Sequence, residues 1–219
     1  MNLNYNILLF TLGVLWIGFL ACAEKDIIET PDEMLGWIGN PEHGLVRERS
    51  GAGIRWTAKY VPHDYLAARY LESLDSYSEA TRDSVMASYA NTLCFLLTVT
   101  PESEEESDVM YRGVGSFEEF QSRAMSLNFK VKDLMTLNYG GKQTPAVIST
   151  MENTYGLHQR RDVMVIFARD EEAWERADTI DCVFDDRIFN SGIHHFTYTV
   201  DDIRRIPTLS IETLKRLHH

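Results

Sequence analysis

Two histidines and two aspartates near the C-terminal end have the side-chain types that catalysis uses. His194 and His195 begin a run rich in aromatic residues and threonine, and Asp185 and Asp186 end the apolar run before it. An imidazole beside a carboxylate is a common general base. Successive side chains of a strand point to opposite faces, so we expect His194 to point inward with Phe196 and His195 to point outward.

This alternation prevents the two histidines from sharing a metal ion easily. A catalytic site would need His195 together with Asp185 or Asp186, and Glu152 is a further carboxylate that could join them. Turns favour aspartate for reasons unrelated to catalysis. We therefore interpret these residues as ordinary strand and turn residues, and we keep a hydrolase based on His195 and the aspartates as an alternative.

The other patterns that could bind a ligand are incomplete. The acidic run at residues 102–108 lacks the alternating ligands and the glycine of an EF-hand. The sequence contains no Gly-x-Ser-x-Gly elbow and no complete phosphate loop. We predict no catalytic residue, no metal ligand and no cofactor.

Cys22 is the residue with the clearest chemical context. It follows an apolar run at residues 7–21 that ends in the small residue Ala21, and polar sequence begins at residue 23. This arrangement resembles the lipobox of bacterial lipoprotein precursors. The resemblance implies cleavage between Ala21 and Cys22, and attachment of a diacylglycerol, with acyl chains such as palmitate, to the Cys22 thiol.

The resemblance divides the chain into a signal peptide (1–21), a lipidated tether (22–32) and one globular domain (33–219). Pro31 is expected to discourage regular structure in the tether. Ala23, in place of aspartate, is similar to the signal for sorting to the outer membrane. The alternative is an uncleaved inner-membrane anchor, because residues 5–23 nearly reach the roughly 20 apolar residues that a spanning helix needs.

Composition limits the partners. The formal net charge of −12 disfavours binding to nucleic acid, whose backbone is also negative. Cys94 and Cys182 both lie in apolar runs. We interpret them as packed thiols, and a disulfide between them is the alternative, since an oxidising envelope permits one.

Alternating and apolar runs predict strands at residues 45–49, 54–61, 92–100, 127–132, 145–149, 163–168, 179–184 and 194–200. The run at 163–168 is apolar on both faces and is expected in the centre of a sheet, whereas Pro145 indicates an edge strand. Helices are predicted at 62–71, after Ser76, after Ser116 and after Ser210. The pattern predicts an α+β fold, mainly an antiparallel β-sandwich with inserted short helices.

These observations favour a non-catalytic accessory or assembly lipoprotein, held on the membrane by its lipid, that binds another envelope protein. A second alternative besides the hydrolase is a carbohydrate-binding lipoprotein that uses aromatic side chains. The candidate aromatic residues are Trp37, Trp56, Tyr60, Tyr65 and Tyr70, of which Trp56 and Tyr60 are expected to point into the core.

Overall fold

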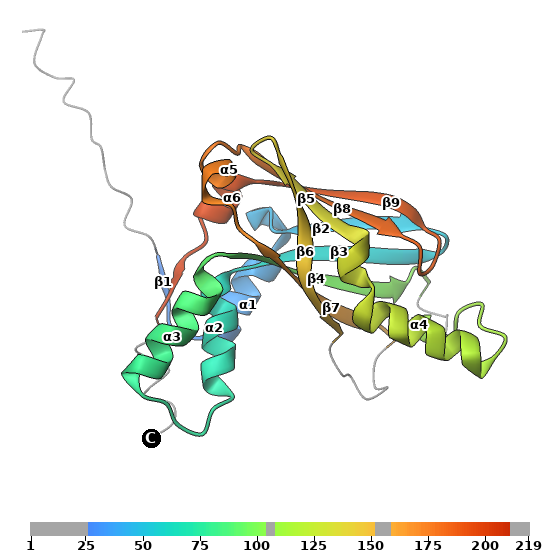
Figure 1. Ribbon diagram of the computed structural model, residues 1–219, viewed down its shortest axis with the longest axis horizontal. Coiled ribbons are helices and arrows are strands. Elements are labelled where there is room, and N and C mark those ends of the chain that lie inside the picture. Colours follow the sequence, from blue (N-terminus) through green and yellow to red (C-terminus); the bar gives the residue numbers. More distant parts are fainter. Residues whose placement is uncertain (1–25, 104–107, 152–158, 211–219) are drawn as a thin grey trace, which may run out of the picture.

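The computed structural model describes residues 26–103, 108–151 and 159–210 (Figure 1). Its strands are β1 (Ile27–Ile28), β2 (Val46–Gly51), β3 (Ile54–Val61), β4 (Thr92–Pro101), β5 (Met135–Tyr139), β6 (Lys142–Met151), β7 (Arg161–Ala168), β8 (Thr179–Asp186), β9 (Gly192–Thr199) and β10 (Thr208–Leu209). Its α-helices are α1 (Pro31–Gly39), α2 (His63–Glu72), α3 (Glu79–Ala90), α4 (Phe117–Phe129), α5 (Glu171–Glu175) and α6 (Val200–Arg204). Its 3-10 turns are η1 (Pro41–His43), η2 (Val109–Tyr111) and η3 (Val131–Leu134).

Within these residues, one eight-stranded sheet in the order β2-β3-β4-β7-β6-β5-β8-β9 curls almost into a closed barrel. Every neighbouring pair is antiparallel. The prediction of a mixed fold with a mainly antiparallel sheet is confirmed. The predicted sandwich is not confirmed, because one continuous strand order joins all eight strands.

The two edge strands of the sheet, β2 and β9, lie side by side where the barrel nearly closes. The Arg47 side chain on β2 crosses this gap and donates from Nε to the carbonyl of Thr197 on β9 at 2.8 Å. At the other end of the gap, a Cβ added to Gly51 would lie only 2.8 Å from the Ser191 carbonyl oxygen. Side-chain contacts and close backbone packing therefore hold these two strands together in place of a ladder of backbone hydrogen bonds.

The interior of the barrel is a packed core rich in aromatic rings. The ring centroids of Trp56 and Phe184 lie 4.8 Å apart in an edge-to-face contact, and those of Phe95 and Tyr198 lie 5.4 Å apart. These side chains alternate with outward residues along their strands, as the period of two requires. The largest fully buried aromatic residues are Trp56, Phe95, Phe167, Phe184, Phe196 and Tyr198.

Strand β6 forms the corner of the sheet. Its residues 142–145 pair with β5 and its residues 146–151 pair with β7, and within the β7 pairing the register shifts between Ala146 and Ile148, which leaves a bulge at Val147. A bulge bends a strand and increases its twist, which lets the sheet curl. The prediction of an edge strand around Pro145 is wrong, because β6 lies between β7 and β5. Pro145 lies close to the change of partner, where a missing N–H is tolerated.

The predicted strand at 127–132 is also wrong, because α4 continues to Phe129 and η3 follows it. Alternation of Leu127, Phe129 and Val131 resembles a strand pattern. Leu127 and Val131, however, are four residues apart, and both are buried, whereas Phe129 is exposed. The spacing is therefore helical. The strand of this region, β5, was not predicted from the sequence and begins only at Met135.

The helix starts follow local capping. Ser116 accepts a hydrogen bond from the Glu119 amide at the predicted start of α4. At α3 the cap is Ser78 in place of the predicted Ser76. The predicted helix after Ser210 lies outside the described residues.

The folded part begins before the predicted end of the tether at residue 32. Ile27 and Ile28 pair in parallel with Thr208 and Leu209. Pro31 does not prevent regular structure and instead opens α1, which Thr30 and Glu33 cap. Proline suits the first helical turn, since the amide there has no partner within the helix.

Candidate functional site

The structure separates the two histidines as the alternation predicts. His194 is buried on the inner face of β9 with Phe196, whereas His195 is exposed on the outer face. His195 shares a hydrogen bond between Nδ1 and the carboxylate of Asp181 at 2.8 Å. Asp181 lies on β8 and is not among the residues proposed from the sequence.

Asp185 and Asp186 have different partners from those proposed. Asp185 lies on the outer side of β8 and forms an ion pair with Arg187 at 2.6 Å. Asp186 is buried inside the barrel end. His195 therefore pairs with neither aspartate in the described residues, and Glu152 lies outside them.

Asp186 is the centre of a buried polar cluster. Its carboxylate accepts the amides of Ile188 and Phe189 at 2.9 and 3.0 Å. It also accepts the Ser191 amide and hydroxyl, and the Trp56 indole N–H at 3.2 Å. Each donor satisfies part of a buried negative charge, so the cluster fixes the turn between β8 and β9 to the core.

The same cluster contains a serine, a histidine and an aspartate, but their order does not suit nucleophilic catalysis. In a catalytic triad the imidazole lies between serine and aspartate and accepts the serine proton. Here Ser191 lies between them and donates its proton to Asp186. The His194 Nε2, 2.7 Å from the Ser191 hydroxyl, must then donate, so it cannot act as the base. Burial lowers the pKa of His194, and nearby Arg49 lowers it further against the opposing effect of Asp186.

The two thiols in the described residues behave as the sequence predicts. Cys94 and Cys182 are buried and free. Burial raises the pKa of the Cys94 thiol to about 11 and raises that of Cys182 further. Thiols in this state are poor nucleophiles and poor metal ligands.

No three His, Cys, Asp or Glu side chains of the described part of the chain lie close enough together to hold a metal ion. Within the same ranges, no helix has the length and apolar character that crossing a membrane requires. Residues 1–25, which contain Ala21, Cys22 and the alternative anchor, lie outside the described residues.

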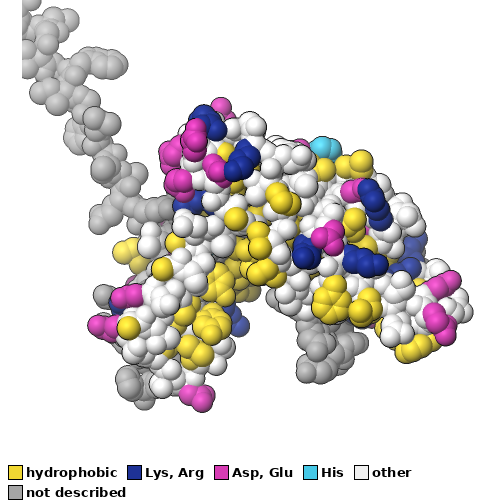
Figure 2. All heavy atoms as spheres, in the orientation of Figure 1, with side chains coloured by type: hydrophobic (Ala, Val, Ile, Leu, Met, Phe, Trp, Pro, Cys, Tyr) yellow, Lys and Arg dark blue, Asp and Glu magenta, His cyan; other side chains and the backbone are white. Residues whose placement is uncertain are grey.

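The outer face of the barrel over β4, β7 and β6 carries an apolar patch beside polar side chains such as Thr98, Asp162 and Thr150, and this patch was not predicted as a surface from the sequence. The strand registers place Leu96 opposite Met164 and Ile166 opposite Ile148. We call these four side chains the outer apolar face. They are only partly covered by other residues, and Ile148 is 49% exposed. Figure 2 shows apolar side chains gathered in the hollow between the α2–α3 hairpin and α4.

The α2–α3 hairpin covers one end of the same row of side chains. Val61 and Cys94 continue the row from Ile166 across β4 to β3, and both are buried. Helix α2 contacts both β4 and α3. Burial raises the pKa of the Tyr89 phenol on α3, and Cys94 and Tyr70 raise it further. The α2–α3 hairpin therefore covers the row of side chains at its β3 end, and the row is more exposed at its β6 end.

Helix α4 forms the opposite border. It contacts β6 and exposes Met125 and Phe129. The sequence contains a signal for this surface, since the run at 163–168 is apolar on both faces. That pattern predicts a strand buried on both faces in the centre of a sheet. β7 is indeed central in the sheet, but its outward side chains Met164 and Ile166 are only partly covered.

The aromatic residues proposed for carbohydrate contact are spread over different environments. Trp56 and Tyr60 are buried, as predicted. Trp37 stacks on His43 at 3.8 Å, Tyr65 is half-buried and Tyr70 is exposed.

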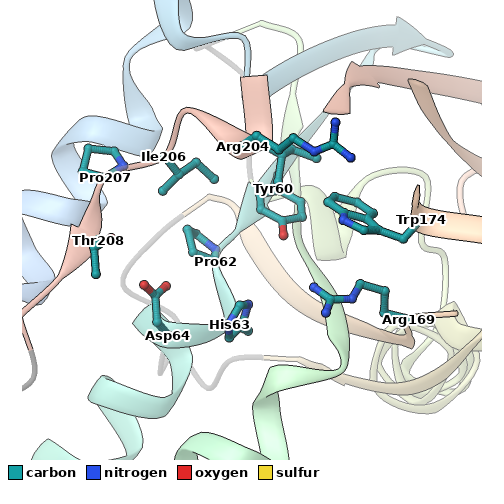
Figure 3. A pocket seen from close by; sticks show the side chains of 11 residues that line it. Tyr60, Pro62, His63, Asp64, Arg169, Trp174, Arg204, Ile206, Pro207 and Thr208 are labelled. Atoms are coloured by element: carbon teal, nitrogen blue, oxygen red, sulfur yellow. The ribbon is translucent and has the colours of Figure 1, made fainter. Parts of the chain in front are cut away.

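A cavity of about 200 Å³ lies where β3 ends and α2 begins (Figure 3). Tyr60 and Arg169 line it, together with Trp174 and the first residues of α2. Arg169 lies 5.6 Å from the centre of the Trp174 ring.

Comparisons with protein-family models, with curated proteins and with solved structures found no significant match to this chain.

Proposed function

We propose that this chain is a lipid-anchored bacterial envelope protein that acts without catalysis, by binding another envelope protein through its outer apolar face. The observation that carries the proposal is the row of Leu96, Met164, Ile166 and Ile148 on the outside of the barrel. Large contiguous apolar patches are uncommon on monomeric proteins and mark interaction sites.

The borders of the face also support a protein partner. The α2–α3 hairpin and α4 flank the sheet on two sides, so the apolar surface is hollowed (Figure 2). Met125 and Phe129 extend it along α4. A partner that inserts an apolar helix or loop would bury side chains from both the sheet and α4, which is the arrangement of a central binding hot spot.

The proposed anchor suits this role. Five chain steps separate Cys22 from Ile27, and they span roughly 18 Å at most. A lipid on Cys22 would therefore hold the β1 end of the domain close to the membrane surface. Each buried methylene of the acyl chains stabilises that attachment by about 0.8 kcal/mol.

Substitution of Cys22 tests the anchor. We expect Cys22→Ser to abolish incorporation of labelled fatty acid and to release the protein from the membrane fraction, with unchanged circular dichroism. Labelling of the substituted protein would show that Cys22 is not the acceptor, and the anchor would then be rejected.

A pair of matched substitutions tests the binding face. Ile148 and Ile193 are both exposed isoleucines on strands, but Ile193 lies on the outer side of β9, away from the outer apolar face. We expect Ile148→Asp to reduce co-purification of the envelope partner from detergent-extracted membranes at least about tenfold. Ile193→Asp is expected to leave it unchanged, and equal effects of the two substitutions would contradict the proposal.

A further inference from the structure

We propose that the cavity beside Tyr60 binds a small organic carboxylate, a property that goes beyond the proposed partner binding. Tyr60 is only 4% exposed, and Figure 3 shows its hydroxyl directed into the cavity. In the described residues this hydroxyl has no hydrogen-bond partner. Buried phenols usually find a partner, so a ligand that supplies an acceptor oxygen would complete this site.

Arg169 supplies the positive charge. Glu171, which is largely exposed, contacts Nε and Nη2 of the guanidinium at 3.0 and 2.9 Å. The guanidinium reaches into the cavity, and within the described residues Nη1 has no ion-pair partner (Figure 3). An arginine with one free edge is well suited to a carboxylate oxygen.

The start of α2 faces the same space. Pro62, which precedes the helix, offers no side-chain cap, and of the first-turn amides that of Tyr65 donates to the Asp64 carboxylate at 2.9 Å. Pro62, His63 and Asp64 line the cavity. The positive end of a helix dipole favours an anion. The Tyr60 hydroxyl, the Arg169 guanidinium and the start of α2 thus converge on one position.

The size and charge of the walls select the class of anion. The volume is below the roughly 300–1,000 Å³ typical of sites for drug-sized ligands, so the ligand is small. Trp174, Ile206 and Pro207 add apolar surface that inorganic phosphate would not use. Asp64 offsets part of the positive charge of Arg169 and Arg204, which favours a singly charged carboxylate over a doubly charged phosphate.

Benzoate is a suitable probe, because it joins one carboxylate to a small apolar ring. We expect titration of the full chain in detergent with millimolar benzoate to shift the NMR signals of the Trp174 indole and the Arg169 side chain. Benzamide, its neutral analogue, and inorganic phosphate are expected to bind at least about tenfold more weakly. Absence of a shift with benzoate, or equal binding of benzamide or phosphate, would overturn the proposal.

Two tyrosines provide a matched pair of variants. The Tyr198 hydroxyl is buried and already donates to the Ala58 carbonyl at 2.8 Å, away from the cavity. Tyr60→Phe and Arg169→Gln should each weaken benzoate about tenfold or more, as expected for loss of a hydrogen bond to a charged group. Tyr198→Phe should leave the affinity unchanged, and an unchanged affinity in Tyr60→Phe would exclude the proposed role of its hydroxyl. Because none of these residues belongs to the outer apolar face, a negative result here leaves the proposed partner binding standing.

Discussion

The two outer sides of the barrel differ in what they present to solvent. Over β8 and β9, Asp181 and His195 bond to each other and Thr197 lies beside them, although Ile193 is also exposed on this side. Over β4 and β7, outward positions hold Leu96, Met164 and Ile166, and Ile148 on β6 lies opposite Ile166. The exposed face of an antiparallel sheet is normally polar. The polar side can therefore remain solvated without a partner, whereas the apolar side is the one that a partner would cover.

The largest expected effect is on stability, and it comes from the buried Asp186 cluster at the inner face of β8. Asp186→Ala would leave the Trp56 indole and the amides of Ile188 and Phe189 without their buried acceptor. We expect the free energy of unfolding to fall by about 3 kcal/mol or more, as measured by urea denaturation of the full chain.

Asp185→Ala is the control for this change, because Asp185 lies next to Asp186 and faces outward with Arg187 as its partner. Its effect should stay within about 0.5 kcal/mol. If both alanine variants unfold at the same urea concentration, the β8–β9 turn is not held from inside the barrel.

A second pair of variants compares how much the inner face and the outer apolar face contribute to stability. Val165 points into the core, and its neighbour Ile166 belongs to the outer apolar face with Ile148. Val165→Thr places a hydroxyl in the core and should cost about 1–3 kcal/mol. Ile148→Thr should change the stability by less than about 0.5 kcal/mol. A large loss of stability in Ile148→Thr would mean that the outer apolar face serves folding and not binding.

The smallest effect is a dependence of stability on pH. Burial lowers the pKa of His194 in the folded protein relative to the unfolded chain. The unfolded chain therefore binds a proton more readily, and this contribution to stability is complete above the unfolded pKa of about 6.5 and is lost as the pH falls below it. Melting temperatures recorded on both sides of that pH should show a weaker acid dependence in His194→Gln. An identical pH profile in the two proteins would exclude His194 as a source of the effect.

Local patterns predicted the parts of the fold that depend on neighbouring residues. The alternation in β3 and β9 placed Trp56, Tyr60 and His194 inside the barrel. The strand predicted at 127–132 was wrong, because the end of a helix and a strand can show the same spacing of apolar residues such as Leu127 and Phe129. The edge strand predicted from Pro145 was also wrong, because the sequence does not show that β6 changes its pairing partner next to this proline.

The contacts of the candidate sites depend on register and on long-range packing. The pairing of His195 with Asp181 follows from the register of β8 and β9 across a five-residue turn, and turn length alone does not reveal it. The exposure of Ile166 depends on how far the α2–α3 hairpin extends over the sheet. The cavity at Tyr60 combines residues from β3, α2, α5 and α6, whose proximity only the folded chain defines.

Photo-crosslinking in cells tests the central claim most directly. A photoreactive amino acid would replace Ile148 in one variant and Ile193 in another, both in the full chain with Cys22 retained. We predict one discrete crosslinked product with an envelope protein from position 148 and none from position 193. No product from position 148, or the same product from both positions, would contradict the proposal that the outer apolar face binds a protein partner.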